Sequence, residues 1–147
     1  MNVIEVFNDS YERCVLSEHF FERFYAKFWS KGESFRQKFE GVDMQKQVRM
    51  LKGSIVFFMM TDTSSDARKM MEKYGKKHGI GNIGVKPEDI DIWFESLLET
   101  VQECDYEYNS DVEKAWRACF KSGLEIMKRE CGTPPSKSDT GQCSKGL

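Results

Sequence analysis

Three polar side chains fall at positions where the surrounding apolar pattern predicts burial. His78 comes four residues after Tyr74 on the same predicted helix face and is followed at once by a glycine-bearing loop. Gln47 lies on the inner face of another predicted helix, and Tyr25 lies among phenylalanines. Burying a polar side chain without a partner costs about 1 to 3 kcal/mol, so each position needs an explanation. Together they fit a pocket in which an imidazole nitrogen binds a metal from one side and two hydrogen-bonding groups face a ligand from the other.

Each of these side chains also has an ordinary structural explanation. A buried histidine often bonds a carbonyl, an inward glutamine can cap a neighbouring helix, and a core tyrosine often reaches out to water. The other histidine, His19, adjoins Glu18 near the start of a predicted helix, and we expect it to be solvated. These alternatives stay open for each residue alone, whereas a pocket accounts for all three at once.

The kind of metal site is restricted by the residues available as ligands. A single histidine without cysteines or carboxylates at ligand spacing cannot make a tetrahedral zinc site. The five cysteines show neither a CxxC pair nor a His/Cys metal spacing. Haem needs only one protein ligand, because the porphyrin supplies the other four nitrogens. The 11 Phe, 5 Tyr, 3 Trp and 8 Met suit the packing of a flat apolar cofactor, and suit an ordinary helical core equally well.

The elements that must position these residues are predicted to be helices. Apolar residues recur at spacings of three and four and show no strand-like alternation, so we predict an all-α fold. The first predicted helix covers 17–31, with Ser17 as its N-cap, and a short helical piece follows at 33–39. Asp43 is the predicted cap of the next helix, and Ser64 or Ser65 that of the one after it. A further helix begins at Pro87, and the last one opens with SDVE at 110–113 as a capping box and ends at Gly132.

Length and charge limit the classes of protein that need to be considered. A chain of 147 residues fits one compact domain, which we place at residues 1–131, with a flexible polar tail at 132–147. The net charge is -2, with 22 basic and 24 acidic residues, so we expect neither a nucleic acid nor a membrane as a partner. The longest apolar run, residues 55–60, is too short to span a bilayer, and the N-terminus has no signal layout. We therefore expect a soluble, cytoplasmic protein.

Four segments, which together cover roughly residues 8–130, resemble the globin family. They are FYAKFWSKGESFRQKF at 24–39, QKQVRMLKGSI, KKHGIGNIGVKPEDIDIWFESLLETV and EKAWRACFKSGLEIMKRE. The chain is most similar to the bacterial single-domain type, which resembles the haem domain of flavohaemoglobins. This resemblance implies a globin fold, a three-over-three helical sandwich that encloses haem b (iron protoporphyrin IX).

The resemblance also implies a role for individual residues. His78 is the proximal ligand and the only protein ligand to the iron, Tyr25 and Gln47 face the bound gas, and Phe39 wedges the haem. Gln45 and Arg49 are the alternatives to Gln47. The implied haem pocket consists of Tyr25, Phe28, Phe39, Gln47, Leu51, His78, Val85, Trp93 and Leu97.

Two departures from the family pattern affect the function that is implied. The corner after His78 is about two residues longer than in flavohaemoglobins, and Ile90 stands where they carry a tyrosine that buttresses the proximal side. A strong electron push from His78, useful in redox catalysis, is therefore not expected. We predict reversible binding of oxygen, nitric oxide or carbon monoxide for storage, transport or sensing, by a monomer or homodimer. The alternatives are a nitric oxide dioxygenase served by an external reductase, and a haem-free sensor that binds a partner; a six-coordinate resting iron, with Gln47 or Tyr25 as the sixth ligand, also stays open.

Overall fold

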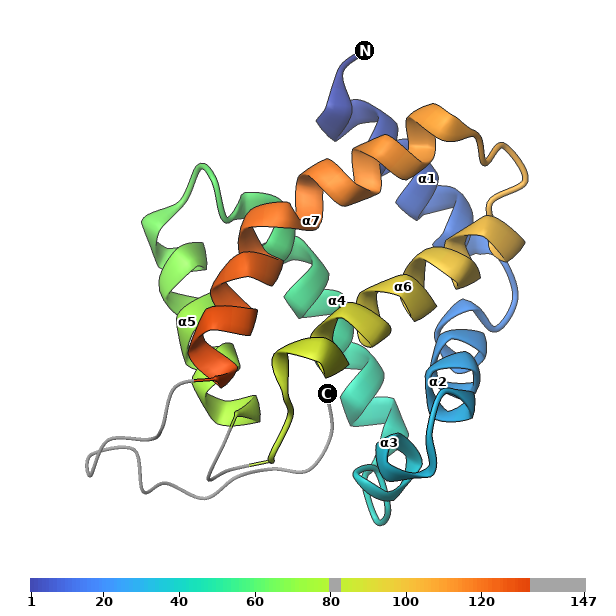
Figure 1. Ribbon diagram of the computed structural model, residues 1–147. Helices are drawn as coiled ribbons and strands as arrows, with labels where there is room; N and C mark the ends of the chain where they lie inside the picture. The colour runs from blue at the N-terminus through green and yellow to red at the C-terminus, as the bar shows by residue number, and fades with distance from the viewer. Residues whose placement is uncertain (80–82, 133–147) are drawn as a thin grey trace.

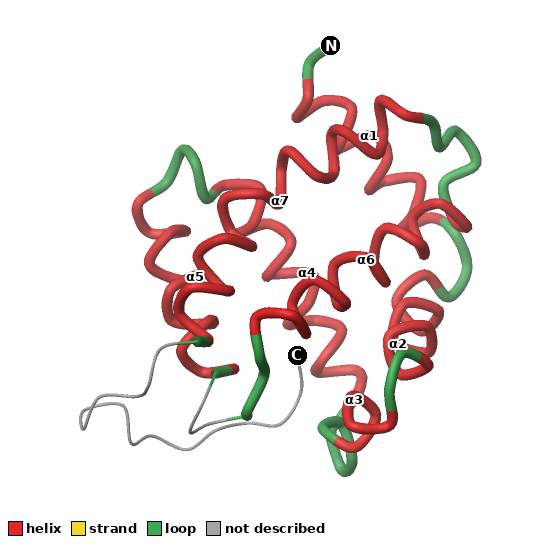
Figure 2. The backbone as a smooth tube through the Cα atoms, viewed as in Figure 1, coloured by secondary structure: helices red, strands yellow, loops and turns green. Residues whose placement is uncertain are grey.

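The computed structural model describes residues 1–79 and 83–132, and this part of the chain is built of helices joined by turns and loops (Figures 1 and 2). The helices are α1 (Val3–Leu16), α2 (Phe20–Ser30), α3 (Glu33–Gln37), α4 (Met44–Met60), α5 (Ser65–His78), α6 (Pro87–Cys104) and α7 (Ser110–Cys131). The predicted all-helical class is confirmed. The predicted tail lies outside the described residues, except for Gly132, which ends α7 as predicted. No helix in the described part combines the length and apolar character that a membrane crossing requires.

Short polar side chains begin most of the helices. Asp43 accepts hydrogen bonds from the first turn of α4, and Ser64 accepts one from the backbone of Ala67 at the start of α5. Pro87 is the first residue of α6, where its missing N–H costs nothing. These three starts agree with the sequence analysis, so the helices that carry Gln47 and His78 begin where the local chemistry predicts.

Two predicted caps are wrong. Ser17 has an extended backbone and ends α1, and the chain then passes through His19 in a left-handed conformation, with φ 62°, before α2 begins. The predicted capping box at 110–113 is displaced by one residue, because Asn109 is the cap and its side chain accepts from the backbone N–H of Val112 at 2.9 Å. The second error arises because asparagine serves as a cap almost as well as serine. Helix α2 instead begins after His19, whose side chain makes no capping hydrogen bond. His19 itself is exposed, as predicted, and its ring contacts the carboxylate of Glu22.

Helix α1 was not predicted. It turns a narrow face inward, on which Phe7, Ser10 and Cys14 are each completely buried. This face packs against α7 and α6, and the ring of Phe7 lies 4.7 Å from that of Trp116. A face only three residues wide, with a serine at its centre, gives a weak apolar signal in the sequence.

Helices α5 and α7 lie side by side and approach unusually closely (Figure 1). A Cβ atom on Gly75 would lie 2.8 Å from Cβ of Glu130, and one on Gly79 would lie 2.4 Å from the carbonyl oxygen of Cys131. Both distances are shorter than real Cβ contacts, so neither position has room for a side chain unless the helices separate. His78 lies between these two glycines in the chain, so the contact with α7 determines where its backbone stands.

A stack of aromatic rings joins α4, α6 and α7 beneath the space between α4 and α5. The ring of Phe58 lies 4.6 Å from that of Phe120 and 5.8 Å from that of Trp93, nearly parallel to both. Gly123 leaves room for Phe58, because a Cβ atom there would lie 2.4 Å from the ring. Two rings of this stack, Phe58 and Trp93, form one wall of the space between α4 and α5, which we call the aromatic floor.

The outer side of α6 carries a row of carboxylates that pair with cations of α2 and α7. Glu95 pairs with Arg117 at 2.9 Å, Asp91 with Lys128 at 3.0 Å, and Glu103 with Lys27. Exposed pairs of this kind stabilise a fold by about 1 kcal/mol or less each. They also neutralise part of the positive charge of α2 and α7.

Candidate functional site

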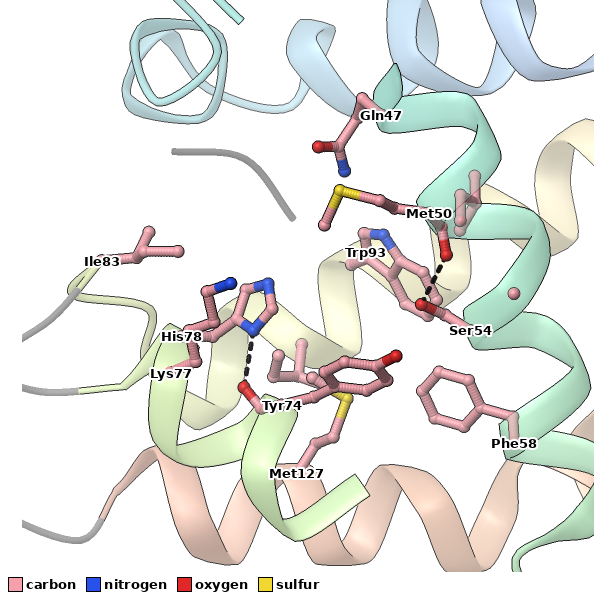
Figure 3. A pocket seen from close by; sticks show the side chains of 13 residues that line it. Gln47, Met50, Ser54, Phe58, Tyr74, Lys77, His78, Ile83, Trp93 and Met127 are labelled. Carbon is pink, nitrogen blue, oxygen red and sulfur yellow. Dashed lines mark hydrogen bonds between the residues drawn. The ribbon is translucent and has the colours of Figure 1, made fainter. Parts of the chain in front are cut away.

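A cavity of about 200 Å³ lies between α4 and α5, above the aromatic floor. Figure 3 shows Gln47 and Met50 of α4 on one side, Tyr74, Lys77 and His78 of α5 on the other, and Trp93 of α6 behind them. The lining residues are Gln47, Met50, Leu51, Gly53, Ser54, Phe58, Tyr74, Lys77, His78, Ile83, Ile90, Trp93 and Met127. The lining contains no carboxylate, and its polar groups are few.

His78 lies at the last position of α5, and a hydrogen bond to its own helix orients its ring. The Nδ1 atom lies 2.6 Å from the backbone carbonyl oxygen of Tyr74 (Figure 3). Because a carbonyl oxygen can only accept, the proton of the neutral ring is on Nδ1, and Nε2 carries the lone pair. This arrangement is typical of metal-binding histidines, in which a hydrogen bond to the second nitrogen holds the tautomer and the ring orientation. His78 thus donates to a carbonyl of its own helix and keeps the lone pair on Nε2.

Gln47 and Tyr25 form a buried polar pair on the opposite side. The Nε2 atom of Gln47 donates to the hydroxyl oxygen of Tyr25 at 3.2 Å, and the two residues are 4% and 1% exposed. Burial raises the pKa of the Tyr25 hydroxyl above its ordinary value, and the hydrogen bond from Gln47 opposes this rise only in part. Tyr25 therefore stays a neutral phenol, able to donate a proton in a hydrogen bond, throughout the physiological range.

Trp93 brings a polar atom to the same region. Its side chain comes from the inner face of α6, and its Nε1–H is buried without a hydrogen-bond acceptor among the described residues. Only one other buried side-chain atom in that part of the chain shares this condition, Nε1 of Trp29. Leaving a buried donor unpaired costs about 1 to 3 kcal/mol of folding free energy. Packing alone therefore does not account for an unpaired indole N–H at Trp93.

The structure brings together some of the predicted site residues and not others. Gln47, Leu51, His78 and Trp93 line the cavity, and Tyr25 lies behind Gln47 and is joined to it by the hydrogen bond. The remaining four, Phe28, Phe39, Val85 and Leu97, are buried in the core and do not line the cavity. The two alternatives to Gln47, which are Gln45 and Arg49, are exposed on the outer side of α4.

Several lining residues were missed by the sequence analysis. Met50 and Ser54 follow Gln47 by three and seven residues, and Tyr74 precedes His78 by four, so helical spacing from the predicted residues could have identified them. Ile83 and Met127 had no such signal, because they reach the cavity from the segment after α5 and from α7.

The donor set fits haem better than a metal centre made of protein ligands alone. Within residues 1–79 and 83–132, no three His, Cys, Asp or Glu side chains gather where they could hold a metal ion. One imidazole with its tautomer held, on a wall that is otherwise mostly apolar, is what a porphyrin-bound iron requires. The volume is below the roughly 300 to 1,000 Å³ of ordinary ligand pockets, so a macrocycle has to displace side chains. Met50, which is flexible and 44% exposed, is the lining side chain best able to move aside.

Comparison with known proteins gives one significant match. No family model matches the chain, and a search of curated proteins finds no match either. Among solved structures, the chain is similar to a Pseudomonas aeruginosa protein whose crystal structure was reported as structurally highly homologous to human haemoglobin. The two chains are 29% identical and superpose with a TM-score of 0.82 over 90% of this chain and 100% of the other. The helices described above therefore form a globin fold.

Proposed function

We propose that this protein is a haem-binding globin that reversibly binds oxygen or another diatomic gas, with haem b as its cofactor. The observation that carries the proposal is the geometry across the cavity. On the α5 side, the Tyr74 carbonyl holds the His78 ring with its lone pair on Nε2, and on the α4 side stands the buried Gln47–Tyr25 pair. The similarity of the segments around these residues to the haem domain of flavohaemoglobins supports the same assignment.

Different lining residues would bind the iron and exclude water from the cofactor. His78 would hold the iron through Nε2, while Leu51, Ile90 and Met127 would keep water away from the macrocycle. When bound, haem supplies an iron atom with one open coordination position for a gas molecule. The side chains of the cavity would form the surroundings of the bound gas molecule.

Gln47 and Tyr25 would decide which gas is held longest. The Gln47 amide and the Tyr25 hydroxyl would donate hydrogen bonds to a gas molecule with partial negative charge, such as oxygen, and each charge-assisted bond would contribute about 1.5 to 3 kcal/mol. Carbon monoxide is less polar and gains less. The pocket is therefore suited to slow release of oxygen.

One observation favours gas binding over nitric oxide dioxygenation. The Nδ1 atom of His78 bonds to a neutral carbonyl, and the cavity lining contains no carboxylate that could make the imidazole more electron-rich. Ile90 lies in the lining as an apolar side chain and offers no hydrogen bond to the histidine. Because the hydrogen-bond partner of a ligating histidine tunes its basicity, this side of the cavity is suited to holding a gas rather than to activating it.

The test is a hemin titration followed by visible spectroscopy. The wild-type chain is reconstituted with hemin, reduced without air, and then exposed to air. We expect a five-coordinate ferrous spectrum that changes to a persistent oxygenated one. A chain that takes up no hemin would exclude the proposal and favour the haem-free sensor.

The chain provides its own matched control, since it has two histidines. His78→Ala should abolish five-coordinate haem binding, whereas His19→Ala, which alters an exposed ring, should leave the spectra unchanged. Loss of coordination in both variants, or in neither, would overturn the assignment of His78.

A further inference from the structure

One wall of the cavity carries a hydrogen-bond donor that has no acceptor in the described part of the chain. Trp93 projects from the inner face of α6, lines the cavity and is 7% exposed, and its Nε1–H is the unpaired group. An indole nitrogen can only donate, so no change of tautomer can pair it with a neighbouring donor. The group therefore calls for an acceptor atom, and the cavity that Trp93 lines is where such an atom can enter.

Packing holds the indole of Trp93 and so restricts the direction of its N–H. The ring of Phe58 stacks on it with the centroids 5.8 Å apart, and the ring of Phe24 meets it edge to face at 5.9 Å. Figure 3 shows the nitrogen on the edge of the ring that faces Gln47 and Met50, away from Phe58. Turning the N–H elsewhere would break both ring contacts, so the donor stays directed toward the space between α4 and α5.

The other groups around this space complement an acceptor that carries negative charge. Gln47 on α4 and Tyr25 behind it are both hydrogen-bond donors, and burial keeps the Tyr25 hydroxyl protonated by raising its pKa. Lys77 adds a positive charge to the described lining, which includes no carboxylate. Donors and a cation stabilise a ligand atom with negative charge, whereas a less polar ligand gains little from them.

Trp29 shows that an unpaired N–H alone does not distinguish Trp93. Its Nε1 is likewise buried without an acceptor among residues 1–79 and 83–132, but Trp29 does not line the cavity. Its ring packs against those of Tyr25 and Phe39 at 5.8 and 5.6 Å. A ligand in the cavity can therefore pair the N–H of Trp93 and not that of Trp29, which makes Trp29 the matched control.

We propose that Trp93 is a specificity-determining residue whose Nε1–H donates a hydrogen bond to the ligand in the cavity, as a third donor beside Gln47 and Tyr25. This inference rests on the proposed function, since the ligand is the gas molecule that the haem pocket would hold. The ligands favoured are those with a negatively charged acceptor atom, which are oxygen and small inorganic anions. Carbon monoxide, which is less polar, is favoured least.

The first test compares Trp93→Phe with Trp29→Phe in the full chain reconstituted with hemin. For Trp93→Phe we expect oxygen to dissociate roughly tenfold faster, and fluoride to bind the ferric protein with a roughly tenfold higher Kd, because each loses one hydrogen bond. Carbon monoxide dissociation should change by about twofold or less. The smaller ring of phenylalanine affects both gases alike, since they are similar in size, so the ratio of the two rates isolates the hydrogen bond. Trp29→Phe should leave all three measurements within about twofold of the wild-type values.

The second test observes the indole N–H directly and does not require Trp93 to be changed. The chain has three tryptophans, and NMR spectra of the ¹⁵N-labelled ferrous protein resolve their indole N–H groups in the oxygen and carbon monoxide complexes. Trp29→Phe and Trp116→Phe assign two of the resonances, so the third belongs to Trp93. We expect the proton of Trp93 to lie further downfield in the oxygen complex, and the other two to be the same in both complexes.

The outcomes separate this inference from the proposed function. Equal acceleration of oxygen and carbon monoxide release by Trp93→Phe would show that only ring volume matters, and would overturn the inference. An indole resonance of Trp93 that is the same in both complexes would overturn it as well. If hemin and oxygen bind but Trp93→Phe behaves like Trp29→Phe, the inference fails and the proposed function stands. If the wild-type chain takes up no hemin, both fail.

Discussion

Two buried polar regions of this molecule differ in how completely their hydrogen-bonding groups are satisfied. At the corner where α1 meets α6 and α7, Ser10 donates to Asp105 at 2.6 Å and accepts from Nε1 of Trp116 at 2.9 Å. Arg13 donates to the same carboxylate at 2.5 and 3.0 Å. In the cavity between α4 and α5, by contrast, Nε1 of Trp93 has no acceptor among the described residues.

The difference separates polar groups that hold the fold from polar groups that serve the cavity. Trp116 and Trp93 are both almost fully buried, yet only Trp116 belongs to a closed network, which we call the corner network: Ser10, Arg13, Asp105 and Trp116. A closed network of this kind stabilises one arrangement of helices. The indole N–H of Trp93 is left without an acceptor among the described residues, an uncommon condition for a buried donor.

The largest expected effect comes from breaking the corner network. Asp105→Ala leaves the guanidinium of Arg13 and the hydroxyl of Ser10 without their shared acceptor, so we expect the free energy of unfolding to fall by about 3 to 5 kcal/mol. Urea denaturation measures this, with Asp9→Ala at an exposed position of α1 as a control that changes it by about 0.5 kcal/mol or less. A loss below about 1 kcal/mol for Asp105→Ala would show that the network adds little.

The next effect concerns the cavity and is seen in ligand binding rather than in stability. Tyr25→Phe removes the hydroxyl next to Gln47, and we expect oxygen affinity to fall by about 1.5 to 3 kcal/mol, roughly ten- to a hundredfold. Carbon monoxide affinity should change much less. Dissociation rates of both gases from the reconstituted protein measure the effect, and equal changes for the two gases would refute a hydrogen bond from Tyr25 to the ligand.

The two tryptophans provide a direct test of the comparison. Trp116→Phe loses the hydrogen bond to Ser10, whereas Trp93→Phe removes a donor that has no acceptor among the described residues. Both variants lose the same ring volume, so the hydrogen bond accounts for most of the difference. We expect Trp116→Phe to be more destabilising than Trp93→Phe by about 1 to 2 kcal/mol in thermal or urea unfolding. The reverse order would mean that the indole of Trp93 is the more important packing element.

The smallest expected effect is a dependence of stability on pH. Burial alone would raise the pKa of Asp105, but the hydrogen bonds from Arg13 and Ser10 hold it below its ordinary value of 3.8. The ionised carboxylate therefore stabilises the folded state at pH values above about 4, and this contribution is lost as the pH falls through the lower, folded-state pKa. Unfolding free energies measured from pH 6 down to pH 3 should decline more steeply for the wild-type chain than for Asp105→Asn. Parallel curves would contradict this role.

The cavity could be predicted from the sequence largely because its two key residues lie within regular helices. The spacing around His78 and Gln47 predicted that both face inward, and the structure places both on the cavity wall, with Gln47 buried and His78 half-buried. The helix starts at Asp43 and Pro87 followed from local chemistry that does not depend on the rest of the chain. Local periodicity and capping therefore account for the part of the site that was found.

The corner network could not be predicted in the same way. Ser10 and Trp116 are 106 residues apart and Ser10 and Asp105 are 95 apart, so no local pattern links them. The same limit explains the missed contributions of Ile83 and Met127 to the cavity. The inward face of α1 was also invisible, because a buried serine reads as a surface residue until its partners are known.

Because Gly75 and Gly79 lie in close contact with α7, the packing between α5 and α7 affects the cavity from outside its lining. A larger residue at either glycine, or a shift in the backbone at Cys131, has to move the end of α5, and with it the His78 ring. Related proteins with identical pocket residues could thus differ in the position and tilt of the histidine ring, because their α5–α7 packing differs. Comparisons of such proteins, and attempts to retune this one, should therefore include the helix pairing behind the histidine as well as the residues that touch the ligand.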